Sequence, residues 1–474
     1  MDQLAVEFCA DTGGTFPMTW GQQAFWQQEV ATYSEEVQNF NIPMVVDLPA
    51  TTSPAGQATV TAVTAALRRL IERNQSLRAH FLDGPSGPLQ RIARAGTFNL
   101  RVCHTTPQDS RARADALAAG LATANFDHET EWGLHIGLVC AGQVPCHVAF
   151  GFSHLMIDGG GIRALIDDFL GLLNGSEPPL PWQPADQVRR EQSPRSARRS
   201  RAAIEYWRKQ FNRIPVSMFP GPAGPAARPR FHRLRLDSRV LAAVAPRLAA
   251  GCQVSVPSVV LAGLALALTA LTGRPICALR VVSSNRHDED LRSMVGAAAQ
   301  HGLFAVSLPG GTGRTVAEAV RTTHRAARSA YFYAYYNPAA LQELRGELAA
   351  QRGVQFGLDS IYNDLSGFLD PADEAAPARI SEAGARKLLA DSVIVPEETW
   401  EGQHCMMYLE ALPGRDGCSL TLVADSVYLP LPTMRTLLRG IETIVLEAAY
   451  RDVAVSDIPV LTGLRPAPGG PLPS

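Results

Sequence analysis

A buried strand, a short polar loop and an amphipathic helix follow one another between residues 146 and 173. The segment Cys146–Phe152 is largely apolar, as expected for a mostly buried strand. After the loop, apolar residues recur at helical spacing from Ile162 to Leu173, and Asn174-Gly175 is a typical helix end. Because the loop Ser153–Gly159 carries a histidine, an acid and a glycine, this unit can hold a titratable side chain rigidly at a strand end.

Helical and strand patterns occur together in both halves of the chain. Apolar spacing predicts a helix that ends at Arg73-Asn74, and a buried helix over residues 259–271 that is too short to cross a membrane. The other elements predicted are helices over 202–211, 316–331 and 431–450, strands over 77–81, 277–283 and 354–362, and hairpins that pair 135–139 with 146–152 and 405–409 with 419–427. This mixture predicts an α+β fold.

The length of 474 residues exceeds what one hydrophobic core usually serves, so we expect two domains. A Pro-rich passage over residues 176–184 marks the boundary, which gives domains 1–185 and 186–464. We expect the Pro- and Gly-rich tail 465–474 to be disordered and residues 370–385 to form a mobile loop.

An arginine-dense segment follows this boundary, with Glu191 the only acid within it. The simplest interpretation is a solvated linker surface. The alternative is a docking surface for an acidic protein or a phosphorylated carrier arm. Its arginines are Arg189, Arg190, Arg195, Arg198, Arg199 and Arg201.

Overall charge and the cysteine pattern exclude several classes of function. A net charge of −2 gives no reason to expect nucleic acid or an anionic membrane as a partner. The first residues have neither the basic start nor the apolar core of a signal peptide. The eight cysteines show no CxxC or paired Cys/His spacing, so we expect reduced thiols and no bound metal. Together these features predict a cytoplasmic protein.

A series of short motifs extends over nearly the whole chain. It consists of Thr19–Trp26 (TWGQQAFW), Asn39–Pro43 (NFNIP), Glu72–Phe81 (ERNQSLRAHF), Asn125–Asp127 (NFD), Ser153–Gly159 (SHLMIDG), Tyr206-Trp207, Asn285-Arg286 and Met294–Gly296 (MVG). In content and order the series resembles that of nonribosomal peptide synthetase condensation domains, whose signature at the fifth motif is HHxxxDG. A single H-x-x-x-D-G arises by chance in a chain of this length with odds of about a few per cent and is only suggestive, so the resemblance depends on the series.

The resemblance implies a fold and a reaction. The expected fold has two lobes, each similar to chloramphenicol acetyltransferase, arranged in a V with a central tunnel. The expected reaction joins an acyl or aminoacyl thioester, tethered to the phosphopantetheine arm of a carrier protein, to an amine. The product is an amide in nonribosomal peptide, antibiotic or related natural-product biosynthesis. We expect a monomer that binds no cofactor of its own.

The resemblance also implies a role for each residue of the loop. His154 matches the second histidine of the signature and would be catalytic, accepting a proton from the attacking amine or orienting it. The alternative is a purely structural histidine. Asp158 would pair with Arg286, so that both shape the loop without touching substrate. Ser153 and Gly159 would have structural roles as well.

Four further residues are expected to lie near substrate. Gly160 would offer a backbone N–H to an oxyanion, although turn geometry is the simpler interpretation. Asn363 matches a polar position that lines the family's tunnel, with a role in a turn as the alternative. His301 and Gln300 would face the amine acceptor.

The chain departs from the family pattern in places. Ser153 replaces the first histidine of the signature, and residues 296–304 lack the family's Asn-Thr pair. No adenylation, carrier or thioesterase motif follows, so we expect a stand-alone enzyme that receives its carrier in trans. Two alternatives stay open: an ester-forming or CoA-dependent acyltransferase of the same fold, and a non-catalytic recruitment module.

Overall fold

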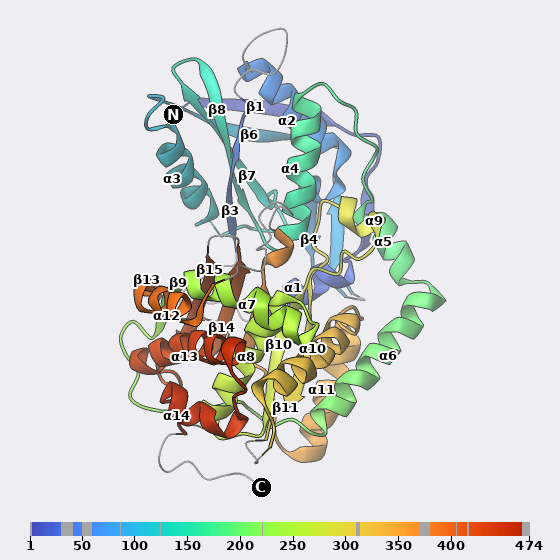
Figure 1. Cartoon of the computed structure of the whole chain (residues 1–474). Helices are drawn as coiled ribbons and strands as arrows, with labels where there is room; N and C mark the ends of the chain where they lie inside the picture. The colour runs from blue at the N-terminus through green and yellow to red at the C-terminus, as the bar shows by residue number, and fades with distance from the viewer. Residues whose placement is uncertain are drawn as a thin grey trace. The chain divides into compact units, whose positions relative to one another are not determined.

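The computed structural model describes residues 2–29, 41–49, 59–85, 87–123, 125–219, 221–309, 313–368, 380–403, 405–414 and 417–466 (Figure 1). The described chain forms two compact units. The first takes in the described residues up to Arg198 together with Ser284–Gln300, and the second takes in Arg199–Ser283 and the described residues from His301 onward. Most of the expected loop 370–385, most of the tail 465–474 and the start of the NFNIP motif lie outside the described residues.

A five-stranded sheet forms the centre of the first unit. Its order is β1 (Asp2–Cys9), β6 (Ala95–Thr105), β7 (Leu134–Ala141), β8 (Val144–Phe152) and β3 (Ile42–Asp47), with only β6 and β7 parallel. The hairpin of β7 and β8 confirms the predicted one. A smaller sheet contains β2 (Gly14–Pro17), β5 (Leu89–Ile92) and β4 (Ala79–Leu82). Buried Phe150, Phe152 and Leu138 show that the large sheet contributes to an apolar core.

Two helices of this unit pack together on the same core. They are α2 (Val60–Arg73), which Thr59 caps by accepting a bond from the Ala62 amide, and α4 (Gly159–Leu173), which Asp158 caps. The unit also contains α1 (Trp20–Glu29), α3 (Ser110–Ala122) and the 3-10 turn Gln75–Arg78. The predicted strand 77–81 is therefore wrong at its start, because this turn occupies residues 75–78 and β4 begins only at Ala79.

A seven-stranded sheet forms the centre of the second unit. Its order is β11 (Gln300–Ser307), β10 (Ile276–Ser283), β12 (Ser360–Asp364), β14 (Met407–Pro413), β15 (Cys418–Asp425), β9 (Phe231–Ser238) and β13 (Val393–Trp400). Residues 354–359 are not part of a strand, unlike the prediction, since their one bridge is the isolated pair Ser217 and Gly357. Residues 382–385 begin helix α12 (Glu382–Asp391), so this part of the expected mobile loop is helical.

The helices of the second unit pack around an apolar helix. This helix, α8 (Val256–Thr272), is buried along most of its length, as predicted, and contacts α7 (Arg239–Cys252), α10 (Val316–Phe332) and α13 (Leu431–Tyr450). Within the described residues, no single helix is long and apolar enough to span a membrane; α7 and α8 reach that length and composition only as a pair bent by 98°.

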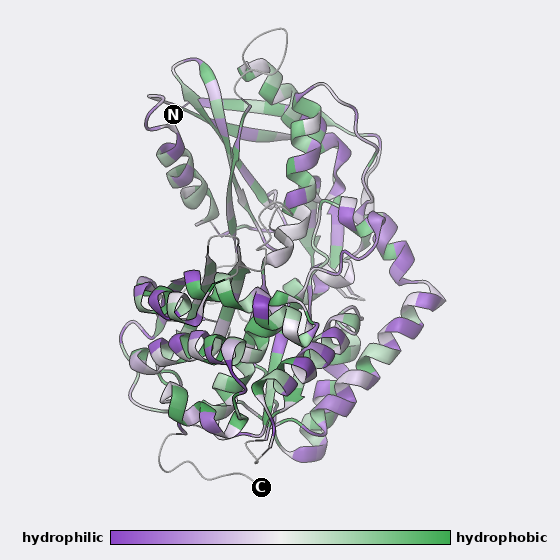
Figure 2. Ribbon diagram, in the orientation of Figure 1, coloured by the Kyte–Doolittle hydropathy of each residue, from purple (hydrophilic) through white to green (hydrophobic). Residues whose placement is uncertain are grey.

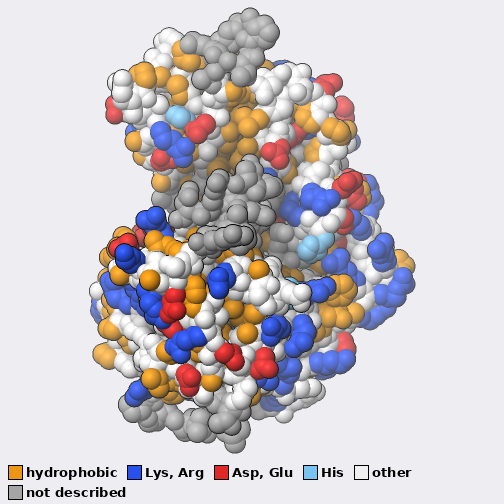
Figure 3. All heavy atoms as spheres, viewed as in Figure 1, with side chains coloured by type: hydrophobic (Ala, Val, Ile, Leu, Met, Phe, Trp, Pro, Cys, Tyr) orange, Lys and Arg blue, Asp and Glu red, His pale blue; other side chains and the backbone are white. Residues whose placement is uncertain are grey.

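The arginine-dense segment is helical. It forms α5 (Pro184–Glu191) and α6 (Pro194–Phe211), and α6 is mostly hydrophilic in Figure 2. Basic side chains also gather on the right-hand face of the molecule in Figure 3, where α5 and α6 lie. On α6, the residues Ser200, Ala203, Trp207 and Phe211 recur every three to four positions and are buried. The expected interdomain linker is therefore a pair of ordered helices with one packed face.

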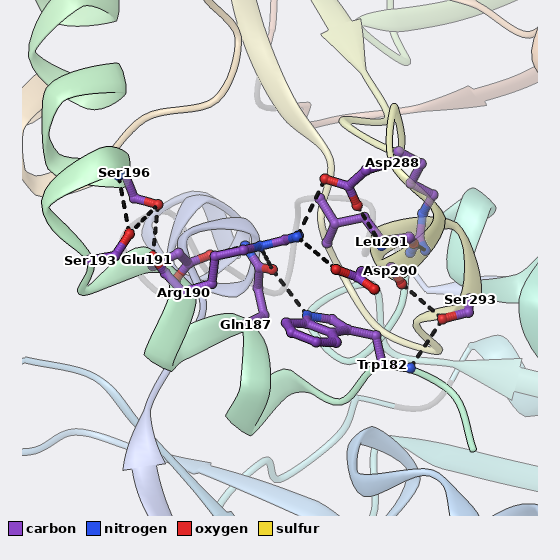
Figure 4. A network of polar contacts seen from close by, with 11 residues as sticks. Trp182, Gln187, Arg190, Glu191, Ser193, Ser196, Asp288, Asp290, Leu291 and Ser293 are labelled. Carbon is purple, nitrogen blue, oxygen red and sulfur yellow. Dashed lines mark hydrogen bonds and ion pairs between the residues drawn. The ribbon is translucent and has the colours of Figure 1, made fainter. Parts of the chain in front are cut away.

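Contacts divide the chain at Arg198, and not at residue 185 as we expected. Figure 4 shows a physical reason, because α5 is bonded to a segment about a hundred residues further along the chain. Arg190 forms ion pairs with Asp288 (3.4 Å) and Asp290 (3.2 Å), and lies over the ring of Trp182. The Trp182 amide in turn donates to the Ser293 hydroxyl. These bonds hold both α5 and the helix α9 (Glu289–Ser293) in the first unit.

Candidate active site

The loop between β8 and α4 is fixed by its own backbone. The Ser153 amide donates to the Gly133 carbonyl (2.9 Å), and the Ser153 carbonyl accepts from the amides of Met156 (3.1 Å) and Ile157 (3.3 Å). The side chains of Leu155, Met156 and Ile157 are fully buried. A tight turn with three buried apolar residues has little freedom to move, so the residue inside it is held rigidly.

His154 is the partly exposed residue of this turn. Its ring stacks on that of Phe25 in α1, with centroids 4.1 Å apart and an interplanar angle of 27°. Its Nδ1 is buried, and none of the described residues forms a hydrogen bond of normal geometry with it. Burial lowers the pKa of His154 below 6.5, against the opposing effect of its own carbonyl, Asp158 and the Ile157 carbonyl. The imidazole is therefore neutral at pH 7 and able to accept a proton.

Asp158 lies at the other end of the loop in a fully bonded, buried site. Its Oδ1 accepts from Arg286 Nη2 (2.9 Å) and the Gly161 amide (2.7 Å), while Oδ2 accepts from the amides of Ala298 (2.7 Å) and Ala299 (2.8 Å). Burial alone would raise the pKa of the Asp158 carboxyl, but the Arg286 guanidinium and these amides hold it below its ordinary value. Asp158 is therefore a carboxylate that joins the loop, α4 and residues 286–299.

Arg286 is held as firmly as its partner. Besides Asp158, it donates to the carbonyl oxygens of Leu291, Met294 (2.7 Å) and Gly296 (2.7 Å). Its side chain is 7% exposed and that of Asp158 is 3% exposed, so little water reaches the ion pair. The structure thus brings Asp158 and Arg286 together, and both belong to the first unit.

The glycines at the start of α4 are required by this packing. A Cβ atom on Gly160 would lie 2.3 Å from Arg286 Nε, and one on Gly161 would lie 2.4 Å from the Gly296 carbonyl oxygen. Gly159, the first residue of the helix, directly follows the cap Asp158. The structure thus gives Gly160 a packing role beneath the Arg286 guanidinium, in addition to any contact with substrate.

Replacing Gly160 with alanine is expected to lower the free energy of unfolding by about 1–3 kcal/mol, because the new methyl group would overlap Arg286. The control is Gly120→Ala in α3, where a Cβ would meet no atom within 4 Å. That change should be neutral or stabilising, since alanine is the better helix former. Urea unfolding of the two variants checks the prediction, and equal stabilities would contradict it.

Ser153 has a partner that the sequence analysis missed. Its Oγ lies 2.7 Å from Nε2 of His128, and the Leu155 amide donates to the same oxygen (3.3 Å). Burial lowers the pKa of His128 to about 4, with Asp127 and Glu131 acting in the opposite direction. The signal available in the sequence was position alone, because His128 directly follows the Asn125–Asp127 motif.

The other expected substrate contacts fall in different places. Gln300 is buried, and its Nε2 donates to the Trp20 carbonyl (3.1 Å) within the first unit. His301 and Asn363 both belong to the second unit. The His301 carbonyl accepts from the Tyr336 hydroxyl (2.9 Å), and the Asn363 amide donates to the hydroxyl of Tyr408 (2.9 Å).

Asn363 is part of a polar cluster on neighbouring strands. Its register partner is Glu410 on β14, which is two residues beyond Tyr408 on the same strand. Burial raises the pKa of the Glu410 carboxyl, although Tyr408, Arg233 and Asn363 oppose this. The cluster explains why Asn363 is ordered within a strand and gives it a role other than the turn residue considered above. Within the described residues, no group of three His, Cys, Asp or Glu side chains could hold a metal ion.

Comparisons with known proteins show the family of this chain and its fold. The family model described as "Condensation domain" matches residues 14–359. The nonribosomal peptide synthetase kk1B of Curvularia clavata is 26% identical over 274 residues, which is 54% of this chain and only 2% of that protein. The condensation domain of the monacolin K polyketide synthase MokA superposes with a TM-score of 0.71 at 14% identity, covering 94% of this chain and 100% of the other. The complex of the X-domain and OxyB from teicoplanin biosynthesis gives a TM-score of 0.68 at 18% identity, covering 97% and 98% of the two chains.

Proposed function

Since this chain belongs to the condensation domain family, we propose that it joins an acyl or aminoacyl thioester to an amine and so forms an amide. The family and its α+β fold, with two sheet-containing lobes of chloramphenicol acetyltransferase type, are shown by the matches above. The observation that supports the specific reaction is the state of His154, a neutral and partly exposed imidazole held in a rigid turn.

We infer the following roles for this chain's residues. Nδ1 of His154 is buried beside the carbonyls of the turn, so it carries the ring hydrogen, and Nε2 presents its lone pair to the amine. Nε2 orients the amine and accepts its proton as the nitrogen attacks the thioester carbonyl carbon. The C–S bond then breaks, and the leaving sulfur takes the proton back from Nε2, so that a thiol is released and the imidazole is neutral again. Asp158 and Arg286 contact neither reactant but fix the turn that holds the imidazole.

The remaining features of the function are proposals on the same basis. The donor thioester would be carried by the phosphopantetheine arm of a separate carrier protein, and the product would belong to nonribosomal peptide or antibiotic biosynthesis. We propose that the protein acts as a monomer in the cytoplasm and binds no cofactor of its own. His301, Gln300, Gly160 and Asn363 remain the residues proposed to contact substrate.

The proposed reaction is tested by mass spectrometry of products. The protein is mixed with acyl-loaded carrier or acyl-CoA, and with an amine or the matching alcohol. We expect an amide as the product, formed when the donor is the loaded carrier and the acceptor is the amine, and no product from the other combinations. Product only from acyl-CoA, or only an ester, would show instead the alternative acyltransferase of the same fold.

Two observations favour a second function, namely recruitment without catalysis. Ser153 replaces a histidine of the signature, and one of the structures similar to this chain is an X-domain in complex with OxyB. In that case the protein would give no product with any donor and acceptor, yet would bind a partner enzyme tightly. Isothermal titration calorimetry of this protein with the enzymes encoded beside it, run together with the product assay, distinguishes the two functions.

The rate is expected to depend on pH in a particular direction. Burial holds the pKa of His154 below 6.5, so kcat should stay constant as the pH falls through 6.5 and decline only at lower pH, once the imidazole is protonated. A weakly basic amine as acceptor keeps its own ionisation out of the profile. A midpoint at or above 6.5 would contradict the proposed environment of the base.

A further inference from the structure

The hydroxyl of Ser153 joins the turn around His154 to residue 128. It lies in the turn itself, accepts from the Leu155 amide on the far side of His154 and bonds His128 Nε2 at 2.7 Å. Ser153 is fully buried, so water cannot replace either bond. His154 therefore lies between Ser153 and Leu155, and the hydrogen bond from the Leu155 amide to the Ser153 hydroxyl closes the turn around it.

His128 is well placed to hold this hydroxyl. The Phe81 amide of β4 donates to its backbone carbonyl (2.8 Å), and its ring packs edge-on against the ring of Phe81, with centroids 6.2 Å apart. The ring of Phe126 is also 6.2 Å from that of His128, at an interplanar angle of 36°. The imidazole is therefore in contact with Phe126, which precedes it in the chain, and with Phe81 on β4. His128 itself is only partly buried, but the Ser153 hydroxyl is fully buried, so little water competes for the hydrogen bond between them.

We propose that His128 is a positioning residue for His154, acting through the hydroxyl of Ser153. The side chains of His128 and Ser153 together place an imidazole beside the turn. This inference rests on the proposed function, since positioning matters only if His154 acts on a substrate.

Loss of the His128 imidazole would act on the turn and not on substrate binding. The Ser153 hydroxyl would lose its partner on the side away from Leu155 and could rotate, which weakens the hydrogen bond that closes the turn around His154. His128→Ala should therefore lower kcat by about tenfold, the effect of one buried hydrogen bond, with little change in KM. Gln at position 128 can place an amide nitrogen near the position of Nε2, so His128→Gln should recover most of the rate.

A thermodynamic cycle separates this role from general loss of structure. The variants are His128→Ala, Ser153→Ala and the double variant, with His135→Ala as control. His135 is also a partly buried histidine that packs on Phe126, with centroids 4.6 Å apart, but its Nδ1 bonds the Leu121 carbonyl and not the turn. The double variant should be no slower than the slower single one, and the control should keep the wild-type kcat.

A second measurement reports the position of the His154 ring and does not require turnover. In protein with nitrogen-15 labelled histidine, His128→Ala should shift the ring resonances of His154 and His128→Gln should restore them, while His135→Ala leaves them in place. If the wild-type protein makes no product, the proposed function fails. The spectrum still tests whether His128 fixes the position of the His154 ring. Unshifted His154 resonances, additive losses in the cycle, or no recovery with glutamine would overturn the inference.

Discussion

Replacing His154 with alanine is expected to lower kcat for amide formation by about 10²–10⁴-fold, the range typical for loss of a general base. The imidazole is the neutral, partly exposed group in the turn, so its removal leaves the amine without a group to orient it and accept its proton. Stability should change much less, because Leu155, Met156 and Ile157 keep the turn buried. Single-turnover assays with loaded carrier measure the rate, and thermal unfolding measures the stability.

The control for this variant is His80→Ala. His80 shares several physical properties of His154: it is partly exposed, its ring lies 4.5 Å from that of Trp132, its Nδ1 is buried without a hydrogen bond to the described residues, and burial lowers its pKa. It lies on β4 and not in the turn. We expect the control to keep kcat within a few fold. Equal losses in the two variants, or full activity of His154→Ala, would remove His154 from the mechanism.

Breaking the ion pair of Asp158 and Arg286 is expected to have the largest effect on stability. Asp158→Ala should lower the free energy of unfolding by about 3–5 kcal/mol, because Arg286 would be left as a buried cation without its partner. The amides of Ala298 and Ala299 would also lose their acceptor. Denaturant unfolding, followed by fluorescence or circular dichroism, measures the loss.

The exposed ion pair of Arg111 and Asp115 in the same unit provides the control. Its closest atoms are 3.0 Å apart, but its side chains are 58% and 53% exposed, so Asp115→Ala should cost little. The double variant Asp158→Ala/Arg286→Met should be more stable than the sum of the single losses predicts, since the unpaired charge disappears. A cost for Asp158→Ala no greater than that for Asp115→Ala would show that burial adds nothing to this pair.

Elements with strong local signals were predicted well from the sequence. The last helix was predicted at 431–450 and is observed at Leu431–Tyr450, because its apolar residues recur at helical spacing over five turns. The buried helix α8 and the two hairpins have similarly clear patterns. The strand expected at 354–362 failed over its first part, since an apolar run cannot report whether a neighbouring strand is available to pair with it.

The candidate site was predicted in part. The order of the motifs placed His154, Asp158 and Arg286 in one constellation, and the structure brings the last two within 2.9 Å. Figure 4 shows what the motifs did not reveal, namely that Arg190 and Trp182 bind residues 288–293 and so keep the segment of Arg286 in the first unit. These bonds join residues about a hundred positions apart, and neither periodicity nor composition records such a pairing.

The sequence by itself determined the helices and strands that have strong local patterns, the family, and the place of His154 in the loop after a buried strand, because these depend on neighbouring residues in the chain. Only the tertiary structure decided that His128 bonds Ser153, that Gly160 lies beneath Arg286 and that the arginine-dense segment is a pair of packed helices. The physical reason is that hydrogen bonds and close packing depend on distances between side chains, and folding brings together side chains that the sequence leaves far apart.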